Sequence, residues 1–534
     1  MAVKLKKYWL PASLLAVLIV YGYLFVSSSG FGHRSTENYT STNKTVQAVT
    51  GGGTNQQVAT VSGQSAADSG QRPRGQFSPG SMQPGQGFNG RMGQGQNTGS
   101  NNYAVPILFF SLAFFGLAIA AYFRLKKKKT GLKPIPAKVL IIFLFAIGFL
   151  LRIFLAALVY GHSSDLSLFR NWANAAANNF SQFYSGRNSS DYPPLYIYVL
   201  YLVGKAAAIP ALSAHYTLLL KIPSILADLV TSFLIYKLAR KYLALESSIL
   251  LAAFYIFNPA VLVNSTLWGQ VDSFFTLIVV AAVCLLAEKR TAWAAVLFTL
   301  AVLMKPQGII FLPVLFFELV RQKDFRVLGK ALLISIFTAA IIVLPFSLQM
   351  GPLWIFRLFT GTLGEYPYAS VNAFNFYSLL GANYINDGTR FFFMTYHTWG
   401  MIFIVALTLL AWLFYHKGKN SGFAAAASLL LITGVFTFSV RMHERYLFPA
   451  VALSILAFIY LRDKRILFLS AGFSLTSYLN THFILFTSGR GMSSAVSNPV
   501  LLGTSLANII LFLYLVKVLY DILFKKRQLF FEAK

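Results

Sequence analysis

Long apolar runs separated by short polar loops dominate the pattern of this chain. Most runs approach the roughly 20 residues that an α-helix needs to cross the hydrocarbon core of a bilayer. The runs lie at 8–26, 105–123, 138–160, 216–236, 247–265, 271–287, 291–304, 306–320, 330–349, 397–415, 421–440, 446–461, 466–485 and 499–519. The pattern predicts an all-α polytopic membrane protein, a helical bundle of about 12 core transmembrane helices preceded by two N-terminal ones.

Two details of this pattern need interpretation. The runs 291–304 and 306–320 are short and Pro306 separates them, so we expect helices that are tilted or stop short of the far interface. The run 8–26 follows three lysines as a signal peptide would. It is long enough to span and lacks a convincing small-residue cleavage site, so we expect a retained helix.

Composition supports the membrane assignment. The chain is 56% hydrophobic and only 11% charged, as expected where the bilayer surrounds the fold. The formal net charge of +29 does not indicate nucleic-acid binding, because the basic residues fall in short runs between apolar segments. The single cysteine, Cys284, lies inside an apolar run, which excludes an intramolecular disulfide and a zinc site of cysteine type.

The lysines and arginines predict the orientation of the helices. With the N-terminus in the cytoplasm, the cytoplasmic loops carry more than half of the 45 basic residues, as the positive-inside rule requires. This orientation leaves no crossing for the apolar, tyrosine-rich stretch 192–208, which we expect to lie along the outer surface as an interfacial helix. The alternative is that 192–208 spans the membrane and one of the short runs does not.

Composition also divides the chain into parts. Residues 1–26 contain the first transmembrane helix. Residues 27–104 are rich in Gly, Gln and Ser with almost no large aliphatic side chains, which predicts a disordered external loop. A second transmembrane helix and a basic cytoplasmic linker occupy 105–137, the core occupies 138–520, and a basic cytoplasmic tail occupies 521–534.

Polar residues gather in the loops of the predicted outer face, although these loops are far apart in sequence. They are Asp165, Asp191, Tyr192, Trp268, Gln270, Asp272, Lys305, Gln307, Arg441, His443, Glu444 and Arg445. Charged groups near hydrocarbon are costly, so a cluster of this kind favours a functional site. Carboxylates, cations and aromatic rings at one membrane surface suit a charged, lipid-linked substrate.

The chemistry of sugar transfer from a polyprenyl phosphate assigns roles to some of these residues. A base must deprotonate the acceptor hydroxyl, and cations must stabilise the charge on the departing phosphate. Asp165, directly after an apolar run, suits the base. Candidates for phosphate contacts are Lys305, Arg441, His443 and Arg445. The lipid-linked phosphate is already a good leaving group, so we expect neither a metal ion nor another cofactor.

Each carboxylate also has a simpler explanation. Asp165 could cap the helix predicted to follow it, because capping residues favour that position. Asp191 precedes a Tyr-Pro-Pro turn, where aspartate often bonds locally. Asp272 could cap the span that it precedes.

The other candidates have structural alternatives as well. Trp268 and Gln270 could be interface residues at a helix end. Lys305 could extend its ammonium group to the surface along an apolar stem. The stretch RMHER at 441–445 could be an ordinary loop in which Glu444 neutralises an arginine.

Three charged residues lie within predicted spans. Lys221 and Asp228 are seven positions apart and so share nearly one helix face, and Arg152 in another span could reach one of them. A structural ion pair is the favoured interpretation over substrate contact, because Asp228 should lie well below the outer surface.

Four stretches together resemble a known superfamily. SSDYPPLY, NPAVLVNSTLWGQVD, LMKPQG and FSVRMHERYLFP, in this order, resemble the polytopic GT-C glycosyltransferases, in particular bacterial relatives of the second mannosyltransferase of GPI-anchor assembly. More distantly they resemble the dolichol-phosphate-glucose-dependent glucosyltransferases. The resemblance covers about 138–520.

The resemblance implies a function. It implies inverting transfer of a hexose, mannose or glucose, from a polyprenyl-phosphate donor to a glycolipid, polymer or protein acceptor at the extracytoplasmic face of the cell membrane. It implies an aspartate base in the first large external loop, which maps to Asp165. Family members often carry a second acidic residue beside this aspartate, and Asp165 has none, so Asp191 remains an alternative base.

Two functions from other classes compete with this interpretation. A transporter or flippase for a lipid-linked saccharide would share the many spans and the cationic rim. It should also show internal repeats and a polar path through the midplane, which the sequence does not show. A non-catalytic scaffold, recruited through 27–104, is the other alternative.

Overall fold

The computed structural model describes residues 101–127, 136–185, 190–418, 422–487 and 498–531. The predictions for 8–26 and for most of the 27–104 segment fall outside these residues. The described helices are α3 (Ala104–Lys127), α4 (Ala137–Leu158), α5 (Ser163–Asn178), α6 (Leu195–Ala207), α7 (Pro210–Ser213), α8 (Tyr216–Tyr242), α9 (Leu245–Ile256), α10 (Pro259–Leu262), α11 (Asp272–Ala287), α12 (Thr291–Met304), α13 (Leu312–Gln322), α14 (Phe325–Ser347), α15 (Trp354–Gly364), α16 (Phe376–Leu379), α17 (Tyr396–Lys417), α18 (Phe423–Phe438), α19 (Pro449–Leu461), α20 (Lys464–Thr487) and α21 (Pro499–Leu523).

Short elements complete the described part. They are the 3₁₀ turns Asn101–Tyr103, Phe183–Ser185 and Pro306–Phe311, the π-helical turn Val263–Trp268, and the strands β1 (Arg390–Phe391) and β2 (Met394–Thr395). The two strands pair antiparallel, with Arg390 opposite Thr395. The described residues are therefore almost entirely helical, as the sequence predicts.

Seven helices of the described part are long and apolar enough to cross a membrane. They are Ala104–Phe123, Ala137–Leu158, Tyr216–Tyr242, Leu245–Trp268, Phe325–Ser347, Tyr396–Lys417 and Pro499–Leu523. The expectation that nearly every apolar run gives a full span is therefore confirmed only in part. The runs at 271–287, 291–304, 421–440 and 446–461 form helices shorter than 18 residues.

Two predicted spans differ in their internal structure. The run 306–320 begins as a 3₁₀ turn and becomes α13 only at Leu312, because Pro306 cannot donate a helical hydrogen bond. The run 247–265 is α9 followed by α10 and the π-helical turn, with the break at Asn258 before Pro259. The residue before a proline disfavours the helical conformation, which explains that break.

Burial explains why the short helices are stable. Almost every residue of α18 and α19 is buried, whereas in α14 only Ala331 and Phe346 are buried. The short helices are thus enclosed by protein, and α14 presents apolar side chains outward, as a helix in contact with lipid does. Helices α18 and α19 therefore need not have the length of a full span, because neighbouring helices surround them.

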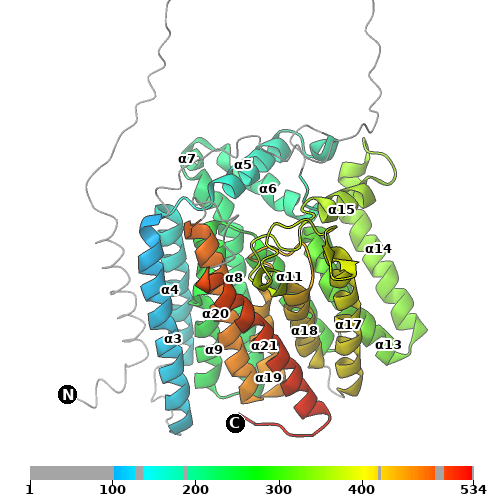
Figure 1. Cartoon of the computed structure of the whole chain (residues 1–534). Coiled ribbons are helices and arrows are strands. Elements are labelled where there is room, and N and C mark those ends of the chain that lie inside the picture. The colour runs from blue at the N-terminus through cyan, green and yellow to red at the C-terminus, as the bar shows by residue number, and fades with distance from the viewer. Residues whose placement is uncertain (1–100, 128–135, 186–189, 419–421, 488–497, 532–534) are drawn as a thin grey trace, which may run out of the picture. The chain divides into compact units, whose positions relative to one another are not determined.

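Helices α5, α6 and α7 gather at one end of the described helices, while α13 and the end of α21 lie at the other (Figure 1). Helix α6 has 13 residues, too few for a span, and packs against α5, α8 and α12. This length agrees with the interfacial helix expected within 192–208. Its relation to a membrane surface remains a prediction.

Candidate active site

Four connections between helices bring the candidate residues together. They are the start of α5, the turn between the π-helical segment and α11, the residue after α12, and the loop between α18 and α19. Ion pairs and hydrogen bonds join Asp165, Trp268, Gln270, Asp272, Lys305 and Arg445 across these connections. We call these six residues the central cluster.

Asp165 is fixed through one of its two carboxylate oxygens. Trp268 Nε1 donates a 2.7 Å hydrogen bond to Oδ2 of Asp165, and the Gln270 amide donates to the same oxygen. Arg445 Nη1 lies 4.0 Å from it. Among the described residues no hydrogen bond reaches Oδ1, and 22% of the side chain is exposed, so this oxygen is available to a ligand.

The predicted capping alternative for Asp165 is wrong. His162 caps α5 and accepts a bond from the Asp165 backbone N–H, and Asp165 lies in the first turn. Burial raises the pKa of the Asp165 carboxyl, but the neighbouring His162 and the charge of Arg445 outweigh burial. The pKa is therefore held well below its usual range.

Backbone geometry allows the indole and the amide to reach Asp165. After the π-helical turn, Gly269 adopts φ 88°, a left-handed conformation that favours glycine. A Cβ at Gly269 would lie 2.8 Å from the Leu166 side chain, and one at Gly161 would lie 2.7 Å from the Trp268 carbonyl. The His162 N–H donates to that carbonyl at 3.0 Å. The two loops are therefore in direct contact because both glycines lack a side chain.

Asp272 joins the cations of the central cluster. One carboxylate oxygen pairs with Lys305 Nζ, and the other accepts a 3.0 Å bond from Asn264 and lies 3.9 Å from Arg445 Nε. Its side chain does not cap α11. The capping alternative is thus wrong for Asp272 as well.

Lys305 is enclosed by protein. Its side chain is only 4% exposed, and its ammonium lies 5.6 Å from the ring centre of Tyr192 and 5.5 Å from that of Tyr446. Gln307 donates a 2.9 Å bond to the Tyr446 backbone carbonyl and so fixes the backbone that carries this ring. The alternative in which Lys305 extends to the surface is wrong.

The two arginines of the 441–445 loop are held differently from each other. Arg445 pairs with Glu444 and lies over the Trp268 ring at 5.6 Å. Arg441, at φ 63°, donates from Nε to Asp387 at 2.7 Å and from Nη1 to the Leu363 carbonyl at 2.6 Å. Arg441 therefore fixes the segment between α15 and α17 and stands apart from the central cluster.

His443 is not a cation in this site. Its ring packs against Tyr366 and Tyr446, and burial together with the charges of Arg445 and Lys305 lowers its pKa to about 3. Any contact with phosphate would use a neutral imidazole. Burial also raises the pKa of Glu444, despite the adjacent Arg445.

A second pair of carboxyl groups lies beside the central cluster. Burial raises the pKa of Asp191, although Lys305 and Arg445 oppose this shift. Burial and the negative charge of Asp191 raise the pKa of Glu365. Thr362 donates a 2.7 Å bond to the Asp191 carbonyl. Sequence reasoning missed Glu365 and Asp387, which both belong to the outer segment between α15 and α17. Their negative charge on the predicted outer face was the available signal.

The ion pair predicted inside the membrane is present. Arg152 Nε lies 3.2 Å from Asp228 Oδ2, both side chains are fully buried, and Ser265 donates to the same oxygen at 2.6 Å. Lys221 instead donates to the Val159 carbonyl at 2.6 Å. These contacts support a structural role for Arg152 and Asp228.

The arrangement is that of a polytopic helical membrane protein with a charged site at one end of its helices. Residues 190–440 match Glycosyltransferase family 87, a family of GT-C-type membrane glycosyltransferases. The matched part is slightly less than half of the chain and contains Asp191, Trp268, Asp272 and Lys305. It begins after Asp165 and ends before Arg441. A comparison with curated proteins gives no match.

The match supports a membrane glycosyltransferase. Neither this match nor the other comparison supports the transporter alternative. The closer resemblance to relatives of the GPI-anchor second mannosyltransferase stays a prediction.

Proposed function

We propose that this protein is an inverting glycosyltransferase. It moves a hexose, mannose or glucose, from a polyprenyl-phosphate donor to an acceptor hydroxyl at the extracytoplasmic membrane face. The observation that carries the proposal is the held Asp165 carboxylate, with Oδ2 bonded to Trp268 and Gln270, Oδ1 unbonded among the described residues, and Arg445 4.0 Å away. A fixed base beside a cation is what transfer from a phosphate leaving group requires.

In the proposed reaction, Oδ1 of Asp165 takes the proton of the acceptor hydroxyl. The acceptor oxygen forms a bond to the anomeric carbon as the bond from that carbon to the phosphate oxygen breaks. The electron pair of the broken bond leaves with the lipid phosphate, and Arg445 and Lys305 stabilise its negative charge. The balance needs no other reactant, and we propose that these side chains act without a cofactor.

The low pKa of Asp165 bears on this role, because a weak base accepts protons poorly. Part of the shift comes from the charge of Arg445. A donor phosphate that engages Arg445 would compensate this charge, so the pKa of Asp165 should rise when the donor is bound. Asp191, whose pKa is raised, remains the alternative base.

Purified full-length protein incubated with polyprenyl-phosphate mannose or glucose, with and without membrane extract, tests the function. We expect one donor to be consumed only when acceptor is present. Asp165→Asn should lower the transfer rate by about 10²–10⁴-fold, whereas Asp191→Asn should retain most activity. Asp324→Asn, at an exposed helix cap near α13, is the matched control. Full activity of Asp165→Asn would remove the base assignment.

Sidedness needs a separate test. Ser164 in the first turn of α5 and Gly388 in the segment between α16 and β1 are both exposed. In a Cys284→Ser background, single cysteines at these positions should both react with a membrane-impermeant thiol reagent added to the periplasmic or external side. Labelling from opposite sides would contradict a shared extracytoplasmic site.

A further inference from the structure

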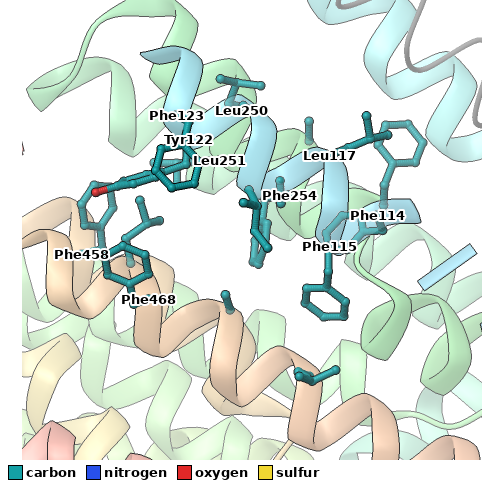
Figure 2. Close-up of a pocket in the computed structure, with 18 of the residues that line it drawn as sticks. Phe114, Phe115, Leu117, Tyr122, Phe123, Leu250, Leu251, Phe254, Phe458 and Phe468 are labelled. Atoms are coloured by element: carbon teal, nitrogen blue, oxygen red, sulfur yellow. The ribbon is translucent and has the colours of Figure 1, made fainter. Parts of the chain in front are cut away.

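The described part contains a cavity unrelated to the central cluster. Its volume is about 410 Å³, and apolar side chains of α3, α9 and α20, with Phe458 and Phe531, line it. Figure 2 shows Tyr122, Phe458 and Phe468 on one side and Phe114 and Phe115 on the other, with open space between them. We call this space the α3–α20 groove.

The groove lies toward the end of the helices away from the central cluster. Helix α19 begins four residues after Arg445 and ends at Leu461, about 20 Å further along its axis. Phe458 lies in its last turn, and Phe468 lies in the second turn of α20. The groove therefore extends into the bilayer leaflet opposite the candidate active site.

The groove is accessible from the bilayer side. Leu117, Phe123 and Phe468 line it and are 36%, 52% and 53% exposed. Apolar side chains with this exposure in a membrane helix contact hydrocarbon chains. A hydrocarbon chain therefore fits both the lining and the access of the groove.

A cation marks one end of this apolar lining. Lys464, Leu467, Phe468, Ala471 and Leu475 follow the spacing of one face of α20, with Lys464 at its first position. No ion pair joins Lys464 to a carboxylate within the described residues. Its charge is therefore available at the end of the groove.

Two aspartates near this end, Asp463 and Asp521, are paired with Arg465. Arg465 donates to Asp463 at 2.8 Å and to Asp521 at 2.9 Å. Arg462, which follows α19, adds a further positive charge beside Lys464. The positive charges of Lys464 and Arg462 therefore both lie at this end of the groove.

The C-terminal segment closes the same end. The Lys464 N–H donates to the Leu529 carbonyl at 3.0 Å, and the Phe531 N–H donates to the Arg462 carbonyl at 2.8 Å. The Phe531 ring packs on Phe458 at 5.4 Å and lines the groove. The segment thereby links the apolar wall to the basic end.

We propose that the α3–α20 groove binds an anionic phospholipid. An acyl chain occupies the apolar space beside Phe254 and Phe468, and the phosphate lies at the end marked by Lys464 and Arg462. Basic residues at the end of an apolar space between transmembrane helices are the arrangement that binds anionic headgroups. The proposal does not depend on the proposed transferase activity.

Native mass spectrometry of the purified full chain tests this site. After exposure to equal amounts of phosphatidylglycerol and phosphatidylcholine, the wild type should retain phosphatidylglycerol preferentially. Ala118→Trp, which fills the groove, should abolish that retention. Ala113→Trp, on an exposed position of the same helix outside the groove, should keep it. Equal retention of both lipids by the wild type, or unchanged retention by Ala118→Trp, overturns the proposal.

The charge contribution has its own readout. Lys464→Gln should reduce the preference for phosphatidylglycerol over phosphatidylcholine by roughly fivefold while total lipid retention persists. An unchanged preference would mean that the end of the groove does not discriminate between anionic and zwitterionic headgroups. Disulfide formation between cysteines at Ala118 and within 8–26, in a Cys284→Ser background, would show that the first predicted span fills the groove instead. Either result overturns the proposal.

Discussion

Arg445 and Arg465 both lie among carboxylates, but their hydrogen bonding differs. Arg465 donates from Nε and Nη2 to Asp463 at 3.0 and 2.8 Å and from Nη1 to Asp521 at 2.9 Å. Arg445 pairs closely only with Glu444, and its Nε is buried without a hydrogen bond among the described residues. Asp165 Oδ2 lies 4.0 Å from Nη1 of Arg445, and Asp272 Oδ2 lies 3.9 Å from its Nε.

The difference separates two uses of a buried arginine. A guanidinium whose three nitrogens all donate hydrogen bonds stabilises the fold and offers little to a ligand. A guanidinium with an unbonded donor and carboxylates just beyond bonding distance can exchange partners when an anion arrives. Arg465 fits the first description and Arg445 the second.

The largest effect on stability should come from Arg465. Arg465→Met removes the guanidinium that pairs with Asp463 and Asp521 and should cost about 3–5 kcal/mol of unfolding free energy. Thermal and denaturant unfolding in detergent measure this change. The transfer rate per folded molecule should stay near that of the wild type. A variant of normal stability that had lost activity would reverse the roles assigned to the two arginines.

Arg445→Lys should show the opposite behaviour. Lysine keeps the charge but cannot reproduce the planar set of donors, so phosphate stabilisation should weaken and the transfer rate should fall by about 10²-fold. The melting temperature should change little, because Arg445 makes one close ion pair. Steady-state transfer and thermal unfolding, measured on the same preparation, distinguish the two losses. A large drop in melting temperature with normal transfer would contradict the comparison.

A smaller effect should come from His443. Its pKa is lowered to about 3 in the folded protein, whereas an unfolded histidine has a pKa near 6.5. Between these values the unfolded state binds the additional proton, so stability is fully present above pH 6.5 and falls as pH decreases. The slope is at most about 1.4 kcal/mol per pH unit for one proton. His443→Gln should flatten the curve of unfolding free energy against pH between pH 6.5 and 5. An unchanged slope would mean that folding does not lower the pKa of His443.

Much of the helical organisation could be predicted from the sequence. The apolar runs locate the long helices because membrane helices need that length, and the shortness of 291–304 was visible. The break at Asn258 and the π-helical turn could not be located from hydrophobicity, because every residue from Asn258 to Trp268 is buried whatever its polarity. Pro259 was the available signal.

Part of the candidate site could also be predicted from the pattern of apolar runs. Polar residues that interrupt apolar runs, such as Asp165, Asp272 and Lys305, are visible in sequence, and the structure brings them together. Glu365 and Asp387 lie in the long connection between α15 and α17, where a carboxylate does not interrupt an apolar run. The neutral state of His443 depends on burial, to which Tyr366 from a distant connection and Tyr446 from the same loop contribute, and sequence spacing does not predict the contact with Tyr366.

The contact between Gly161 and the Trp268 carbonyl, with Gly269 against Leu166, affects how substrates could act on one another. Neither loop can shift without displacing the other, so a ligand that moves Asp165 also moves the indole and amide that hold it. Donor and acceptor binding should therefore be coupled energetically, and the donor dissociation constant should change when acceptor is present. Gly161→Ala, which forces the loops apart, should reduce that coupling.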